Sequence, residues 1–269
     1  MMSAVTESTG GVGAVGARAV RGLGLGVVLA MGAGCAGSET GNGQQSGARR
    51  PVAIVVQLTG NPSLSGTDAD GAELSVESGI ALVDRLEIAL PDGVDCDFPT
   101  VTAAYATHCD AGDARLVVDG PWTVDLVSGE TWPPLDGLEL PEGELGAIAL
   151  KMKGDTGAAR AALTLEGTFK ASREAAGRPF ALELGGAVVA KFDPSEALVV
   201  SRATTGLGLW LDVTGWFATL RLGSCIAAGG VPEVDGVLLL NRAEKRTCGN
   251  VEAALRTALV SSGRARSSE

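Results

Sequence analysis

The stretch Leu163-Thr-Leu-Glu-Gly-Thr-Phe169 decides the fold, because its apolar and polar residues alternate more clearly than anywhere else in the chain. Its leucines and its phenylalanine fall on one side at a period of two, and its threonines and Glu166 fall on the other. A β-strand turns successive side chains to opposite faces of a sheet. The pattern therefore predicts a strand with one buried face and one solvated face.

Similar short apolar runs, separated by turn residues, continue along most of the chain, and such a series predicts a β-sandwich. Over 80–90 the apolar residues recur at a period of two, although a helix also accommodates part of that pattern. Asp119-Gly120-Pro121 predicts a turn between two short strands, and Gly185-Gly186 predicts a hairpin turn or a bulge. The expected strands are 52–58, 80–90, 115–118, 122–127, 145–152, 161–169, 180–192, 198–200, 207–213 and 236–240.

One helix is expected near the C-terminus, over 250–260. Its apolar residues recur at helical spacing and form one stripe: Val251, Leu255, Ala258 and Leu259. Residues 261–269 are small and polar, and we expect them to form a disordered tail. The predicted fold class is mainly β: an antiparallel β-sandwich with short helices and one C-terminal helix, spanning 51–260.

The N-terminus has the pattern of a bacterial lipoprotein signal. A basic patch precedes an apolar run over 22–34, and the run ends in Ala33-Gly34-Cys35. The run is too short to span a bilayer as a helix, which takes roughly 20 residues. We therefore expect residues 1–34 to be removed and Cys35 to carry lipid, which makes the membrane a partner. Residues 35–50, rich in glycine, serine and glutamine, are expected to form a flexible tether.

The net charge of the chain and the residue after Cys35 indicate which partners and which compartment to expect. A formal net charge of −11 repels phosphate backbones, so we expect no nucleic-acid partner. Alanine rather than aspartate follows Cys35, which favours a lipoprotein of the bacterial cell envelope sorted to the outer membrane. The glycine-rich run in the signal follows no strand and is not a nucleotide-binding motif, and no cofactor is expected.

Four cysteines remain beyond the lipid site, and an even number in an exported chain predicts two disulfides. Three pairings are possible. We expect Cys96–Cys109 and Cys225–Cys248, because the members of each pair lie close together in sequence. A zinc site is the alternative, although the cysteines lack Cys-x-x-Cys spacing and the chain has a single histidine.

Several short motifs resemble a family of bacterial lipoproteins that carry an uncharacterised, prealbumin-like β-sandwich domain. Leu58-Thr59-Gly60-Asn61-Pro62 resembles the end of the family's first strand, with glycine in place of its aspartate. Asp125-Leu126 and then Leu140-Pro141-Glu142-Gly143, which leads into Ile148-Ala149-Leu150, resemble a later part of the domain. The resemblance covers roughly residues 52–213. It implies a fold and a compartment, and it implies no activity.

Catalytic and metal-binding patterns are sparse. His108 is the only histidine, so a Ser-His-Asp hydrolase would have to use it, yet no Gly-x-Ser-x-Gly elbow is present. Paired carboxylates could serve a glycosidase. Asp68-Ala69-Asp70-Gly71-Ala72-Glu73 has the spacing of a calcium-loop start but lacks the later ligands. A second acidic cluster is the better calcium candidate: Asp92, Asp95, Asp97, Asp110 and Asp113. We therefore expect neither a metal site nor a catalytic residue.

Two tryptophans suggest a binding face. If 207–217 form one strand, Trp210, Asp212 and Trp216 share a side and form a platform for a sugar or a protein. The alternative is that 212–215 form a turn and both rings cover the core. We expect a binding or structural module with an envelope glycan or protein as ligand, not an enzyme. The alternative function is a secreted, carboxylate-dependent hydrolase that acts on glycans.

Overall fold

The computed structural model describes residues 51–60, 64–94, 96, 107–135, 137–154, 160–171, 176–194 and 197–269. The predicted signal peptide, Cys35 and most of the predicted tether lie outside these residues. Fifteen of the described strands form one large sheet, and two short strands, β8 (Gly143–Glu144) and β13 (Val199–Val200), form a separate pair.

The strands are β1 (Pro51–Gly60), β2 (Ser65–Thr67), β3 (Glu73–Ala89), β4 (Thr107–Asp110), β5 (Arg115–Asp125), β6 (Thr131–Trp132), β7 (Leu138–Pro141), β8 (Gly143–Glu144), β9 (Ile148–Lys153), β10 (Leu163–Lys170), β11 (Arg178–Leu184), β12 (Ala187–Pro194), β13 (Val199–Val200), β14 (Gly206–Leu211), β15 (Glu233–Val234), β16 (Val237–Leu239) and β17 (Gly263–Ser268). The helices are α1 (Thr214–Phe217), α2 (Leu222–Ala227), α3 (Lys245–Cys248) and α4 (Val251–Val260), with a 3₁₀ turn, η1 (Leu240–Arg242).

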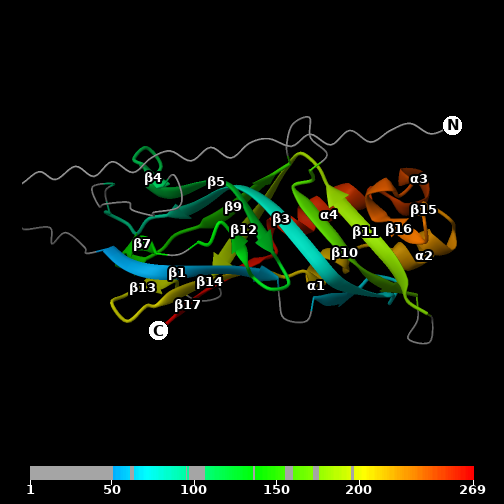
Figure 1. The fold of residues 1–269 in the computed structure, drawn as a ribbon, viewed down its shortest axis with the longest axis horizontal. Coiled ribbons are helices and arrows are strands. Elements are labelled where there is room, and N and C mark those ends of the chain that lie inside the picture. The colour runs from blue at the N-terminus through cyan, green and yellow to red at the C-terminus, as the bar shows by residue number, and fades with distance from the viewer. Residues whose placement is uncertain are drawn as a thin grey trace, which may run out of the picture. The chain divides into compact units, whose positions relative to one another are not determined.

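The longest strand, β3, has neighbours along both of its sides (Figure 1). On one side, β10 pairs with its first half and β9 with its second half. On the other side, β2 pairs with its first residues and β5 with its second half. The strand predicted over 80–90 is therefore confirmed. A helix there is excluded, because the backbone groups of this segment are used in ladders with β5 and β9.

The alternation in 163–169 correctly predicts strand β10 and its two faces. Leu163, Leu165 and Phe169 are buried, whereas Glu166 is exposed. The same logic holds for most of the sheet, whose inward residues join one hydrophobic core. Burial of apolar surface contributes about 25 cal/mol per Å² and is the main force that holds these strands together.

The turn predicted at Asp119-Gly120-Pro121 is wrong, because β5 runs through it as one strand. Val83 pairs with Trp122 and Arg85 pairs with Asp119, so two residues of β5 lie opposite one residue of β3. This bulge accommodates a proline, which lacks a backbone donor for the ladder. It also requires Gly120, since a Cβ there would lie 2.3 Å from the carbonyl oxygen of Val83.

The sheet is mixed, not wholly antiparallel as predicted. Three strand pairs are parallel: β1–β14, β11–β16 and β12–β17. Gly185-Gly186 is neither a hairpin turn nor a bulge, because β11 and β12 do not pair with each other. Instead β11 pairs with β10 and β16, and β12 pairs with β9 and β17. Alternation in a sequence reports which face a residue occupies and carries no information on which strand lies alongside.

The C-terminal helix is confirmed, but the disordered tail predicted over 261–269 is wrong. Helix α4 begins after Asn250, whose side chain accepts a hydrogen bond from the amide of Ala253 (3.1 Å). The chain then forms β17, which lies between β14 and β12 in the sheet. Polar residues suffice here because backbone hydrogen bonds hold the strand to β14 along its whole length and to β12 over 263–265, and only Ala265 and Gly263 turn inward.

Both predicted disulfides are present. Cys96 and Cys109 have Cα atoms 5.5 Å apart, and Cys225 and Cys248 have Cα atoms 4.9 Å apart. The first bond ties the segment after β3 to β4, and the second ties α2 to α3, which Figure 1 shows gathered beside β15 and β16. Because all four cysteines form disulfides, their thiolates are not available to bind zinc, and the alternative of a zinc site is excluded.

We predict that Gly120→Ala destabilises the protein by about 1–3 kcal/mol, because the new methyl group meets backbone atoms that no side-chain rotation can move. The urea midpoint of unfolding measures the change. Gly185→Ala is the matched control, since a Cβ there meets nothing within 4 Å. Equal midpoints for the two variants would show that the bulge does not require glycine.

Candidate functional site

The predicted binding face of Trp210, Asp212 and Trp216 is not assembled. Trp210 lies on β14 and is partly exposed. The strand ends at Leu211, and Val213 has helical φ and ψ as the first residue of the turn that leads into α1. This change of backbone breaks the period of two, so Trp216 is fully buried in the core. Of the proposed platform, Trp210 and Asp212 remain partly exposed, whereas Trp216 does not.

Asp212 lies beyond the strand and accepts a hydrogen bond from the hydroxyl of Thr214. It therefore helps to shape the start of α1. The alternative was that 212–215 form a turn and that both tryptophan rings cover the core. It is correct for Trp216, which is buried, and wrong for Trp210, which is partly exposed. The outward face of β14 thus holds one tryptophan and, at the two preceding outward positions, Gly206 and Gly208.

An open groove of about 1260 Å³ runs over this face of β14. Its floor includes Gly206 and Gly208, which carry no side chains above the sheet, and Trp210 stands at one end. The register places Val55 and Ser268 beside Gly206, and Gln57 and Arg266 beside Gly208. The predicted β1 and the unpredicted β17 therefore form the two sides.

The groove combines an aromatic surface with hydrogen-bonding groups. Gln57 and Arg266 are exposed, and Arg266 makes no side-chain hydrogen bond or ion pair within the described part of the chain. A Cβ at Gly208 would make only an ordinary contact, 3.6 Å from the carbonyl oxygen of Arg266. Packing therefore does not demand glycine at 208, and its absence of a side chain leaves the groove open.

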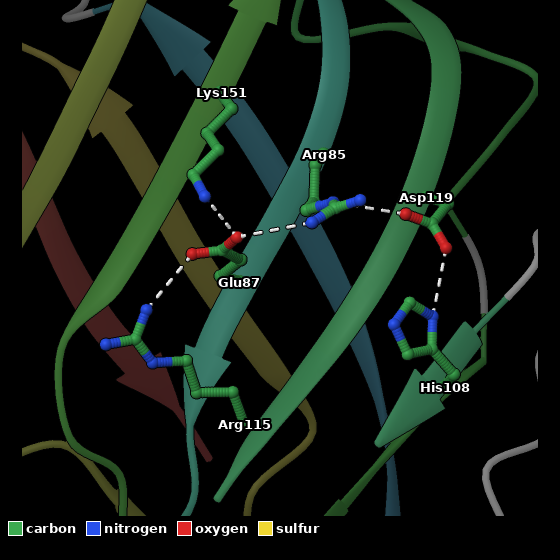
Figure 2. A network of polar contacts seen from close by, with 6 residues as sticks. All are labelled: Arg85, Glu87, His108, Arg115, Asp119 and Lys151. Atoms are coloured by element: carbon green, nitrogen blue, oxygen red, sulfur yellow. Dashed lines mark hydrogen bonds and ion pairs between the residues drawn. The ribbon is translucent and has the colours of Figure 1, made fainter. Parts of the chain in front are cut away.

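A second polar assembly surrounds Glu87 and contains the only histidine of the chain (Figure 2). Glu87 on β3 is buried, and its carboxylate accepts hydrogen bonds from Lys151 on β9 and from Arg115 on β5 (3.2 Å). The guanidinium of Arg85 lies 3.8 Å from the same carboxylate and bridges to Asp119, to which its Nε donates at 3.2 Å.

Three cations hold the Glu87 carboxyl group ionised. Burial is the largest single influence and would raise its pKa. The hydrogen bond from Lys151 and the charges of Lys151, Arg115 and Arg85 act in the opposite direction, and together they lower the pKa below its ordinary value of 4.5. A general acid of a glycosidase needs a raised pKa, so Glu87 has the opposite property.

His108 belongs to the same assembly. Its Nδ1 lies 3.0 Å from Oδ2 of Asp119, and its side chain is 53% exposed. A histidine and an aspartate are two members of a hydrolase triad. Within the described residues, however, Asp119 is the one polar partner of the imidazole, and no hydroxyl or thiol group is hydrogen-bonded to it.

The first calcium candidate is explained by backbone contacts. Asp68 accepts hydrogen bonds from the amides of Asp70 (2.9 Å), Ala72 (2.8 Å) and Gly223 (2.7 Å), and Asp70 accepts one from Ser224 (2.8 Å). The hydrogen bonds from Ser224, its backbone amide first, lower the pKa of Asp70. The turn is thereby fastened to α2.

Of the second acidic cluster, Asp95 and Asp97 lie outside the described residues. Asp110 accepts a hydrogen bond from the amide of Gly112 (3.1 Å). Among the residues that are described, no three histidine, cysteine or acidic side chains are grouped so as to hold a metal ion. None of the described helices has the length and apolar character needed to cross a membrane.

Comparison with known proteins adds little. No family model matches the chain, and no curated protein matches it. Among solved structures, MbnP from Methylosinus trichosporium is similar over 63% of this chain and 78% of that chain, with 12% sequence identity and a TM-score of 0.33. A TM-score this low defines no shared fold.

The groove residues that sequence reasoning missed are Gly206, Gly208, Gln57 and Arg266. A signal was present in Gly206-Leu-Gly-Leu-Trp-Leu211, where glycine occupies the outward positions that strands normally fill with polar residues. Arg266 could not be found in this way, because its segment has no periodic apolar pattern.

We predict that Glu87→Gln lowers the free energy of unfolding at neutral pH by about 1.5–3 kcal/mol, since it removes hydrogen bonds between charged groups. The lowered pKa of Glu87 stabilises the fold above pH 4.5, and this stabilisation is lost as the pH falls through the folded-state pKa. The variant should therefore lose less stability than the wild type between neutral pH and pH 3.

Urea titrations across this pH range measure the effect. Glu233→Gln is the control, because the Arg178–Glu233 pair is exposed on both sides and such pairs contribute at most about 1 kcal/mol. Parallel pH profiles for the wild type and Glu87→Gln would contradict the role assigned to the three cations.

Proposed function

We propose that the protein is a lipid-anchored component of the bacterial cell envelope whose β domain binds a glycan chain along the groove over β14. The observation that carries the proposal is the glycine floor beside Trp210. A sugar ring has apolar C–H faces and polar edges. Trp210 and the glycine floor can contact the apolar C–H faces of a sugar. The amide, hydroxyl and guanidinium groups of the groove can form hydrogen bonds with its polar edges.

The shape of the groove supports a chain in preference to a small compact ligand. The outward residues of β14 lie in a row along the strand, in the order Gly206, Gly208 and Trp210. Gln57 and Arg266 flank the middle of this row from opposite sides. One sugar can stack on Trp210 while the next ones lie over the glycines and reach hydrogen-bonding groups on both sides.

The anchoring half of the proposal rests on the sequence. Basic residues, a short apolar run and Ala33-Gly34-Cys35 support lipid attachment at Cys35 and removal of 1–34. The small polar residues that follow Cys35 support a flexible tether between the lipid and the β domain. A flexible chain of that length spans about 20 Å on average. The mainly-β fold is also what the lipoprotein resemblance implies.

We predict that Trp210→Ala weakens glycan binding about 30-fold, corresponding to the roughly 2 kcal/mol typical of a well-placed aromatic contact. Gly208→Val should abolish binding without loss of stability, because valine fills the groove and favours a strand. Affinity electrophoresis in soluble neutral polysaccharides measures binding, and circular dichroism checks the fold.

Trp132→Ala is the matched control, since Trp132 is 75% exposed on β6 and outside the groove. If Trp132→Ala lost binding and Gly208→Val retained it, the proposal that the glycan binds in the groove would be wrong. If the domain bound an envelope protein in a manner that required Trp210, and bound no glycan, a protein ligand would be favoured. Hydrolysis that His108→Ala removes would favour the hydrolase alternative.

We predict that the intact mass of the protein purified from a bacterial envelope corresponds to a chain beginning at Cys35 with lipid attached. The same protein carrying Cys35→Ala should remain unlipidated and leave the membrane fraction. An unmodified Cys35, or a mature N-terminus elsewhere, refutes the anchor and leaves the groove proposal intact.

A further inference from the structure

The cationic cluster around Glu87 is formed by Lys151, Arg85 and Arg115. Their side chains are 41%, 41% and 44% exposed, whereas that of Glu87 is 9% exposed. With Asp119 included, three cations face two carboxylates, so the cluster keeps one net positive charge in a protein of net charge −11. The negative charges lie underneath or to one side, and the cations reach the solvent.

Most hydrogen-bond donors of the cluster are unused. An ammonium group has three N–H donors and a guanidinium group has five. Lys151 and Arg115 each donate one hydrogen bond to Glu87, and within the described residues neither side chain has another acceptor. Figure 2 shows the guanidinium of Arg115 meeting Glu87 through one end while its other end points away. These donors are available to an external acceptor.

The cluster continues along the sheet. Its members come from three adjacent strands, β9, β3 and β5. Ala149 pairs with Glu87 on one side and with Lys191 of β12 on the other, so the exposed Lys191 extends the same row by one strand. Lys153, exposed two residues beyond Lys151, faces the same side. The result is a strip of basic side chains on the outward face of four strands.

We propose that this strip is a second binding site, and that it takes a linear acidic polysaccharide through the carboxylates of its sugars. The cations of the strip already bind carboxylates, because Arg115 donates to Glu87 and Arg85 donates to Asp119. Arginine pairs with a planar carboxylate through two parallel hydrogen bonds. A linear polymer touches only the strip, whereas an extended anionic surface would meet the net charge of −11.

The site is independent of the groove, because it uses β12, β9, β3 and β5, whereas the groove uses β1, β14 and β17. The charges of the site also predict that one substitution increases its affinity for an acidic polymer. Glu87→Gln removes a negative charge from beneath the cations and raises the net charge of the cluster by one. It should therefore bind an acidic polymer more tightly than the wild type, even though the fold is less stable.

The experiment measures binding of polygalacturonate to the purified protein by calorimetry at low and at physiological salt. We expect the wild type to bind, with weaker binding at higher salt. Lys151→Gln combined with Arg115→Gln should reduce affinity about tenfold, and Glu87→Gln should raise it several-fold. Lys191→Gln supplies a second test, because its side chain has no partner within the described residues and its loss should not disturb the fold.

Arg178→Gln is the matched control, an exposed cation elsewhere in the sheet, and should bind as the wild type does. No binding by the wild type, or equal affinity in the wild type and in the Lys151/Arg115 and Lys191 variants, overturns the proposal. Equal or stronger binding to polyphosphate, DNA or anionic phospholipid vesicles also overturns it. Polygalacturonate affinity that depends on Lys151, Arg115 and Lys191 tests the strip, whereas binding of neutral polysaccharides tests the groove, so the two proposals fail separately.

Discussion

Pairing along both sides of β3 is the constraint on which the rest of the structure depends. A strand of 17 residues is long enough to hold two neighbours in series on each side, so β10 and β9 follow one another along one edge and β2 and β5 along the other. One strand therefore connects two parts of the sheet. Asp84 is an extra residue of β3 relative to β9, because Val83 pairs with Met152 and Arg85 with Lys151, and it keeps Val83, Leu86 and Ile88 facing the core. Without it, one half would turn its apolar residues to solvent.

The two candidate sites arise from different consequences of this sheet. The groove depends on β17, which enters between β12 and β14 and brings Arg266 beside Gly208. The charged strip depends on four adjacent strands, β12, β9, β3 and β5, that carry long side chains on their outward face around Glu87. In both cases a side chain acts with partners far away in the sequence. Lys151 and Glu87, for example, are 64 residues apart.

Much of the fold could be predicted from local patterns. The alternation in β10, the strand over 80–90 and the apolar stripe of α4 each report burial of one face, and burial is what the sheet and core require. The candidate site was predicted less well. Trp210 was found because its neighbours Leu209 and Leu211 alternate with it, whereas Trp216 was misplaced because the helical turn at Val213 leaves no mark in hydrophobicity.

The sequence by itself indicated most of the long strands, most of the residues that face the core and the pairing of the cysteines, because periodicity and short separation are local properties of a chain. Only the tertiary structure decided which strands lie side by side. It placed β17 in the interior of the sheet although its sequence, Gly-Arg-Ala-Arg-Ser-Ser, is that of a polar tail. The reason is physical: a strand between two others is held by backbone hydrogen bonds, which every residue except proline can make, and these depend on available neighbours and not on side chains.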